Sequence, residues 1–203
     1  AVAGIVPEIL DLKYLFIETN SKVYYNTNLA PSASFVSTKV QRDLTAYAES
    51  SELNKYGARF KYSRFLKVID SSHESVTSNI TTVEMRRDLR LAISEVAEYA
   101  IDFGNEFHIQ SMNGFNIRSS AFRVLNINTD VYLYDIPDLT GEKGQISLFS
   151  LNEGSSTPVI QRRNIGVIDY KKGRITLDPI NIVSGKTKDN VDILEISATP
   201  ESN

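Results

Sequence analysis

Apolar positions recur at helical spacing in the region after Pro31. Residues three or four apart lie on one side of a helix, so this spacing predicts a helix with a single apolar face. The apolar residues of this run are Val36, Val40, Leu44 and Tyr47. Ser32 and Ser34 precede the run, and either is expected to cap the first turn by accepting its free backbone N–H bonds. Gly57 then interrupts the pattern at a turn.

A second helix and a long strand are predicted after this turn. Phe65, Leu66 and Ile69 restore the helical period, with Ser63 as the expected cap. From Ser75 to Leu89 apolar and polar residues alternate instead, which is typical of a strand. Residues 11–27 alternate loosely and predict one or two strands ahead of the helices. The first part of the chain is therefore predicted to be a small β-α-α-β module with two helices packed on a sheet.

Beyond residue 100 the pattern becomes a series of short alternating runs separated by turn residues. Such spacing favours an antiparallel all-β module. Structural turns are expected at Gly104 and at Gly173, which follows Lys171 and Lys172 in a hairpin loop and needs a positive φ. The fold class is thus predicted as α+β, with an α/β module at 1–95 and a β-rich module at 96–203. The connection from Leu89 to Asn105 is the predicted boundary and a candidate hinge.

Composition narrows the range of functions. The chain has 203 residues, a net charge of −3 and no cysteine. The missing cysteines exclude disulfides, thiolate metal sites and a cysteine nucleophile. The small acidic charge gives no general attraction for nucleic acid, and no apolar run approaches the roughly 20 residues of a membrane span. The start AVAGIVPEI lacks the basic region of a signal peptide and the chain lacks an initial Met, so a fragment of a longer protein is expected. No partner is expected among nucleic acids or membranes.

Few residues suggest catalysis. Asp70, His73 and Glu74 could form a general-base or metal fragment of a hydrolase, but polar residues are also expected in a loop between a helix and a strand, and the loop interpretation is favoured. His108 alternates with apolar neighbours and is expected at the surface. No cofactor, metal or catalytic residue is predicted.

Two further groups of charges have plain structural explanations. Asp135, Asp138 and Glu142 surround a glycine-bearing turn without the order of a calcium loop, and a solvated hairpin is favoured. Basic pairs are best explained as solvated strand edges, because charges discourage edge pairing; the alternative is a nucleic-acid surface. These pairs are Arg86-Arg87, Arg162-Arg163 and Lys171-Lys172.

Aromatic residues are the most informative group. The chain has ten tyrosines and nine phenylalanines. Core packing explains most of them, but tyrosine favours half-buried positions and is enriched in protein–protein interfaces. The candidate interface residues are Tyr24, Tyr25, Phe107, Phe115, Tyr132 and Tyr134.

Several ordered motifs resemble one protein family. They are LTAYAESSELNKYGARFKYSRFLKVID, SNITTVEMRRDL, YAIDFGNEFHI, VLNINTDVYLYDI and GVIDYKKGRITL. Together they resemble the C-terminal part of the baseplate wedge proteins of T-even-type contractile-tailed bacteriophages, within the wider baseplate J-like group. None of these motifs is catalytic.

This resemblance implies a structural virion protein of the tail baseplate, assembled in the host cytoplasm. It implies self-association as a homodimer or ring, binding to other wedge and hub proteins, and relay of the conformational change that triggers sheath contraction. A rival hypothesis is a carbohydrate-binding or adhesin-type β module, which predicts exposed aromatic residues beside polar loops. The chain offers tyrosines for this purpose but no tryptophan.

Overall fold

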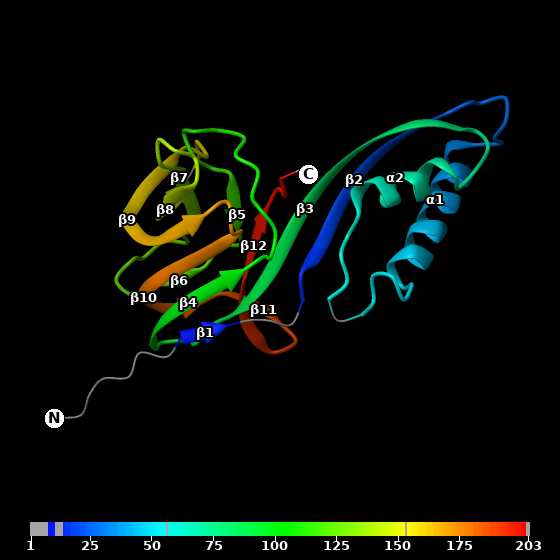
Figure 1. The fold of residues 1–203 in the computed structure, drawn as a ribbon. Helices are drawn as coiled ribbons and strands as arrows, with labels where there is room; N and C mark the ends of the chain where they lie inside the picture. Colours follow the sequence, from blue (N-terminus) through cyan, green and yellow to red (C-terminus); the bar gives the residue numbers. More distant parts are fainter. Residues whose placement is uncertain (1–7, 11–13, 56, 153, 202–203) are drawn as a thin grey trace. The chain divides into compact units, whose positions relative to one another are not determined.

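The computed structural model describes residues 8–10, 14–55, 57–152 and 154–201. These residues form two helices and twelve strands (Figure 1). Their bounds are β1 Glu8–Leu10, β2 Phe16–Tyr25, α1 Ala33–Ala48, α2 Tyr62–Asp70, β3 Val76–Arg90, β4 Val96–Asp102, β5 Ile117–Ser119, β6 Arg123–Val124, β7 Tyr132–Pro137, β8 Lys143–Leu151, β9 Pro158–Asp169, β10 Arg174–Ser184, β11 Lys186–Lys188 and β12 Val191–Ala198. Both helices follow the first strands and almost all strand pairs are antiparallel, so the predicted α+β class is confirmed.

The chain divides into two compact units. Thr19–Val83 forms one, here called the helical unit, and Ala1–Glu18 together with Glu84–Asn203 forms the other, the β unit. The 15 residues of β3 contribute to both units, because the division falls between Val83 and Glu84. These units differ in extent from the modules at 1–95 and 96–203, which remain a prediction based on composition.

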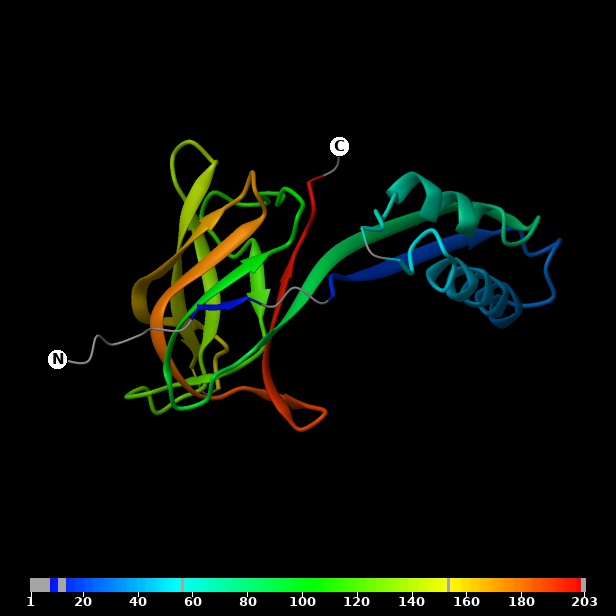
Figure 2. The same ribbon diagram turned by 60° about the horizontal axis from the view of Figure 1, so that its bottom comes forward.

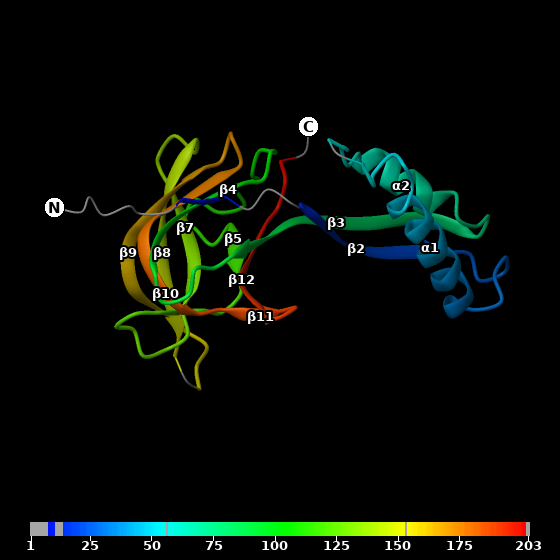
Figure 3. The same cartoon turned by 90° about the horizontal axis from the view of Figure 1, so that it is seen from below.

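In the helical unit, α1 and α2 pack against the β2–β3 strand pair (Figure 3). The apolar face predicted for α1 supplies buried Val36, Val40 and Tyr47 to the core of this unit. From α2, Phe65 and Ile69 join the same core. Neither helix is long and apolar enough to cross a membrane, as far as the described residues go.

The starts of the two helices differ. The Ser32 hydroxyl accepts a hydrogen bond from the Phe35 N–H at 3.2 Å, as expected of a cap. The cap predicted at Ser63 is wrong, because the N-cap of α2 lies two residues earlier, at Lys61, whose side chain makes no capping bond. Tyr62 fixes this start instead, since its hydroxyl donates to the Thr81 carbonyl at 2.9 Å.

The β unit contains a seven-stranded sheet in the order β1-β4-β10-β9-β8-β7, with β6 paired to β10. Figure 2 shows β10, in orange, beside β4, in green. A five-stranded sheet runs β11-β12-β3-β2, with β5 paired to β12. β1 pairs in parallel with β4, and this is a strand that the sequence pattern did not predict. The largest fully buried side chains of the unit include Tyr99, Phe103, Leu133 and Tyr170.

The connection predicted as a hinge lies inside this core. Leu89, Tyr99 and Phe103 are each no more than 2% exposed, and β4 is an inner strand of the seven-stranded sheet. A segment held by packing on this scale is poorly suited to bending, because local opening needs few buried contacts. The packing around Leu89, Tyr99 and Phe103 therefore argues against a hinge in this connection.

The three predicted structural turns have backbone angles that suit glycine. Gly57, Gly104 and Gly173 have φ values of 72°, 66° and 65°. At Gly173 the surroundings add a second restriction, because a Cβ atom there would overlap the carbonyl oxygen of Asn105. The β9–β10 hairpin loop therefore requires glycine for both conformation and space.

Candidate interaction surface

Phe115 has a backbone conformation that is rare for its residue type. Its φ is 64°, in the left-handed region, and its side chain is 50% exposed. This conformation costs roughly 1–2 kcal/mol for a residue with a Cβ atom. It persists only where the surrounding structure fixes it, and such residues cluster at functional positions.

A buried carboxylate holds the loop that carries Phe115. Asp135, on β7, is fully buried, and its Oδ1 accepts the backbone N–H bonds of Asn116 at 2.8 Å and Ile117 at 2.9 Å. Its Oδ2 accepts the Asn116 side-chain amide at 2.7 Å and the Tyr170 hydroxyl at 2.5 Å. The backbone N–H of Phe115 donates to the Asp135 carbonyl at 3.3 Å. Four donors directed at one carboxylate compensate for much of the hydration it has lost.

The other members of this network fit the same geometry. Asn116 also donates from its side-chain amide to the Ser111 carbonyl at 2.9 Å, which closes the loop 111–116 on itself. A Cβ atom at Gly114 would overlap the Asp135 carbonyl oxygen, so the loop approaches β7 as closely as glycine allows. Burial, and then the neighbouring Asp135 charge, raise the pKa of the Tyr170 hydroxyl far above its usual range. The phenol therefore stays protonated and remains a donor.

Around Phe115 the β7 and β8 strands present three more aromatic rings. The Phe115 ring stacks on Tyr134 with centroids 5.0 Å apart, and meets the Phe149 ring edge-on at 5.4 Å. The Tyr132 ring lies 5.4 Å from that of Phe149. These four rings, Phe115, Tyr132, Tyr134 and Phe149, are called the aromatic surface below. The Tyr134 hydroxyl is buried and has no hydrogen-bond partner within the described part of the chain.

The structure separates the six candidate interface residues into three groups. Phe115 and Tyr132 come together in the aromatic surface, whereas Tyr134 is 2% exposed and contributes by stacking against the Phe115 ring, not by facing a partner. Phe107 is 2% exposed and packs edge-on against Phe103 in the core, so it is not available to a partner. The alternation of apolar and polar residues around Phe107 is as typical of a buried strand position as of an interface.

The remaining pair lies on β2 in the helical unit. Tyr24 is 41% exposed, and Lys22 lies over its ring. Tyr25 is half-buried and lines a pocket of about 390 Å³ between β2 and α1, together with Val36 and Val40. Tyr25 therefore serves the core of this unit, and Tyr24 alone faces outward.

Three residues of the site were not predicted from the sequence. Phe149 occupies an ordinary alternating position in β8, and Asn116 carries no motif. Asp135 was predicted in a solvated hairpin turn, and this is wrong: it lies inside the apolar run YLYDIP of β7 and is fully buried. An acidic residue within such a run was the available signal, because a carboxylate buried in a strand needs dedicated donors.

The charged clusters considered as catalytic sites are held in local structural contacts. His73 Nδ1 lies 2.9 Å from the Ser75 hydroxyl, while Asp70 accepts from the Asn79 amide at 2.7 Å. His108 Nδ1 lies 2.7 Å from a Glu201 carboxylate oxygen. Among the residues that the structure describes, no group of three or more His, Asp or Glu side chains could hold a metal ion.

The turn at 138–142 is solvated, in keeping with its hairpin position between β7 and β8. Asp138 accepts from the Thr140 hydroxyl at 2.6 Å, and this bond is the main reason that its pKa lies below the usual range. Glu142 pairs with Lys171 at 2.8 Å across to the neighbouring hairpin loop. Asp138 and Glu142 are therefore engaged in local turn and surface contacts.

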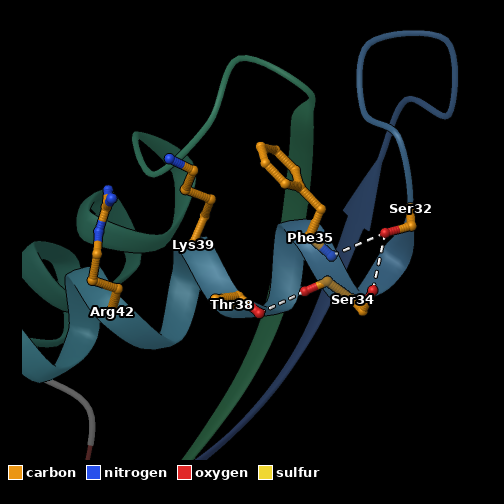
Figure 4. A pocket seen from close by; sticks show the side chains of 6 residues that line it. All are labelled: Ser32, Ser34, Phe35, Thr38, Lys39 and Arg42. Atoms are coloured by element: carbon orange, nitrogen blue, oxygen red, sulfur yellow. Dashed lines mark hydrogen bonds between the residues drawn. The ribbon is translucent and has the colours of Figure 1, made fainter.

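A pocket of about 330 Å³ lies at the start of α1 (Figure 4). Its hydroxyl groups are used within the helix, since Ser32 caps the first turn and Thr38 donates to the Ser34 carbonyl at 2.8 Å. Its two cations are also engaged, because Lys39 lies over the Phe35 ring and Arg42 pairs with Asp43 at 2.9 Å. The pocket therefore offers no unused polar group around which to build a site.

One of the basic pairs takes part in an ionic network in the β unit. Arg86 pairs with Glu18 at 2.6 Å and with Asp88, and it lies over the Phe16 ring. Lys188 reaches Asp88 at 2.9 Å. Burial by itself would raise the pKa of Asp88, but hydrogen bonds from Lys188 and Arg86 outweigh it and hold that pKa below its usual value. The network joins β2, β3 and β11, so Arg86 has a structural role here.

Comparisons with known proteins point to one family. Residues 13–88 match the family described as baseplate structural protein gp6, C-terminal domain III. Over 141 residues the chain is 28% identical to the baseplate wedge protein gp6 of Enterobacteria phage T4, an alignment that covers 66% of this chain and 21% of that protein. The chain therefore spans about a fifth of the length of this relative. These two matches confirm the resemblance to the C-terminal part of baseplate wedge proteins: the chain is similar to them, and residues 13–88 match the family of gp6 C-terminal domain III.

Proposed function

We propose that this chain is the C-terminal part of a wedge subunit of a phage tail baseplate. Its work is structural: it self-associates, binds other wedge and hub proteins to build the ring around the hub, and relays the conformational change that triggers sheath contraction. It is assembled in the host cytoplasm and ends in the virion. The relationship to baseplate wedge proteins supports a structural, non-enzymatic role in the baseplate.

The aromatic surface is the observation that carries the assembly role. Phe115 leaves half of its ring exposed although four donors to Asp135 fix the loop that displays it. A phenylalanine side chain buries 150–250 Å² when fully covered, so covering the exposed half of this ring would remove roughly 100 Å² from water. At about 25 cal/mol per Å² this contributes about 2.5 kcal/mol to association.

The fixed conformation of Phe115 is expected to strengthen association. A side chain whose conformation is already fixed loses little freedom on binding, so more of the burial energy appears as affinity. Aromatic anchors of this type commonly lie at the centre of protein interfaces, surrounded by residues that exclude water. The neighbouring Tyr132, Tyr134 and Phe149 rings supply such surroundings.

The experiment compares Phe115→Asn with the wild-type chain. Asparagine adopts left-handed backbone angles more easily than most residues, so this change removes the ring without disturbing the loop. We expect self-association, measured by light scattering over a concentration series, to weaken by about 10- to 100-fold, in line with a loss of about 1.4–2.7 kcal/mol. Co-purification with co-expressed wedge proteins of the same virus is expected to fall in parallel.

Leu139→Asn is the matched control. Leu139 is fully exposed at the tip of the β7–β8 hairpin and lies outside the aromatic surface. It is expected to leave both readouts within about twofold of wild type. If Phe115→Asn assembles and binds like the control while remaining folded, the aromatic surface has no role in assembly.

One observation also favours the rival class of function. Phe115 lies beside the polar residues Ser111 and Asn113, which is the arrangement expected of a carbohydrate-binding β module. A glycan array separates the two hypotheses. Binding of a defined glycan by a chain that stays monomeric would favour the carbohydrate-binding module, and self-association without glycan binding would favour the wedge subunit.

A further inference from the structure

The first half of β9 has a strand partner on one side. Residues 158–162 pair with β8, from Pro158 opposite Leu151 to Arg162 opposite Leu148. On the other side β10 pairs only with the second half of β9, from Gly166 to Asp169. The described strands give β9 no third neighbour. Residues 158–163 therefore form an open strand edge within the seven-stranded sheet.

Two residues explain why β9 and β10 part at this point. Their pairing ends at Leu177 opposite Gly166, and Pro179 follows two residues later in β10. Proline has no N–H and cannot donate to a ladder, so β10 departs from β9 and continues against β6. On β9, Asn164 has a φ of 55° and donates its N–H to the Ser147 hydroxyl, which marks a bulge.

The direction of the backbone bonds along the open edge follows from the hairpin register. The Asn152 N–H donates to the Thr157 carbonyl, which makes this a hydrogen-bonded pair. Pairs in an antiparallel ladder alternate between bonded and non-bonded, so Val159 opposite Ser150 faces β8. Ile160 opposite Phe149 then directs its N–H and carbonyl away from β8, toward the open side. An added strand would find both a donor and an acceptor there.

The side chains of this half-strand are also exposed to solvent. Every residue from Pro158 to Asn164 is exposed, including Val159 at 43% and Ile160 at 42%. Beside them lies a pocket of about 480 Å³, lined by Asn126, Ile127, Asn128, Thr129, Gln161 and Arg162. The open edge therefore has a hollow next to it that is bordered by amide and hydroxyl groups from the loop between β6 and β7.

The charge of this edge indicates what could cover it. Arg162 and Arg163 lie on the half-strand, and within the described residues neither makes an ion pair. Asp130, the acidic residue of the adjoining loop, is paired with Arg123 at 2.7 Å. Two uncompensated cations on a strand edge deter a second basic edge and attract carboxylates.

We propose that the open edge of β9 binds an extended acidic segment of a partner protein, which adds as a strand beside residues 158–163. Backbone bonds to Ile160 give affinity, as in other cases of strand addition, and carboxylates near Arg162 and Arg163 select the partner. A second copy of this edge is a poorer occupant. Self-pairing centred on Ile160 would place Arg162 against Pro158 and leave all four arginines without a carboxylate. The proposal does not depend on the aromatic surface, which lies on different residues.

The test uses a labelled eight-residue peptide, Glu-Glu-Val-Val repeated twice, with blocked ends, and fluorescence polarisation on the whole chain; its adjacent glutamates supply a carboxylate on each face of the added strand. The same peptide with lysine in place of glutamate is the control ligand. The acidic peptide is expected to bind, with weaker binding at high salt, and the basic peptide is expected not to bind. Arg162→Gln combined with Arg163→Gln should weaken binding about fivefold, through the loss of two exposed ion pairs.

Two further variants separate strand addition from general charge attraction. Ile160→Pro removes an N–H that points to the open side and should abolish binding, while the β8 ladder keeps its bonds. Lys171→Gln combined with Lys172→Gln removes two cations from a different loop and should leave binding unchanged. If Ile160→Pro does not fold, the acidic peptide with proline in place of valine takes over its part, because it lacks amide N–H groups at those positions and should not bind if binding adds a strand.

Several results would overturn the proposal. They are the absence of binding, equal losses from the arginine and lysine pairs, and a self-association that Ile160→Pro abolishes while the wild-type chain ignores the peptide. The last result would assign the edge to a second copy. Phe115→Asn is expected to bind the acidic peptide normally, so failure of the assembly role and failure of this proposal give different results.

Discussion

Replacing Asp135 by asparagine tests whether the buried carboxylate fixes the aromatic surface. The retained oxygen can still accept the backbone N–H bonds of Asn116 and Ile117, which lie 2.8 and 2.9 Å from Oδ1. The new NH₂ group would face two donors, the Asn116 amide at 2.7 Å and the Tyr170 hydroxyl at 2.5 Å. A buried donor left without an acceptor costs about 1–3 kcal/mol. We therefore expect the β unit to lose about 2 kcal/mol of unfolding free energy.

Differential scanning calorimetry is the suitable assay, because it separates the unfolding of the two units if they melt independently. A loss of about 2 kcal/mol should lower the Tm of the β unit by roughly 4–8 °C. Tyr170→Phe removes one of the four donors and should cost about 1.5 kcal/mol. The double variant should cost less than the sum of the two, because both residues belong to one network.

The control for this series is Asp130→Asn. Asp130 forms an exposed ion pair with Arg123, so its loss should stay within about 0.5 kcal/mol. The reasoning fails if Asp135→Asn is as stable as this control, or if the two changes in the network are strictly additive. Either result would mean that the hydrogen bonds to Asp135 do not hold the loop of Phe115.

Three other predictions concern single groups. Gly173→Ala should lower the free energy of unfolding in urea by about 2–4 kcal/mol, because its Cβ atom would overlap Asn105. In the control Gly57→Ala the new Cβ atom meets nothing within 4 Å, so the loss should be only about 1 kcal/mol. Equal losses would show that the overlap at Gly173 is relieved freely. Asp88 has a lowered pKa, so its contribution is complete above about pH 4 and is lost as the pH falls further; Asp88→Asn should flatten the acid limb of a Tm-against-pH profile, and an unchanged limb would contradict this. Tyr170 has a raised pKa, so stability should fall as the pH rises above about 10, and Tyr170→Phe should remove part of that fall.

Local patterns in the sequence were sufficient for the elements of the helical unit. The apolar spacing of α1 and the cap at Ser32 depend on residues within a few positions of one another, so they can be read without a fold. The same is true of the long alternation in β3 and of the positive φ at Gly173. The cap of α2 was missed by two residues, because the observed start is held by the bond from Tyr62 to Thr81, 19 residues away.

The tertiary structure alone decided which residues form surfaces. Phe107 and Phe115 looked alike as aromatic residues in short runs, yet packing in the β unit buries the first and leaves half of the second exposed. Two features depend on which strands become neighbours. One is the set of four donors around the Asp135 carboxylate, and the other is the open strand edge at Ile160. Alternation fixes the two faces of a strand within its own residues, but the pairing of strands depends on side chains distant in the chain, and no local pattern contains that information.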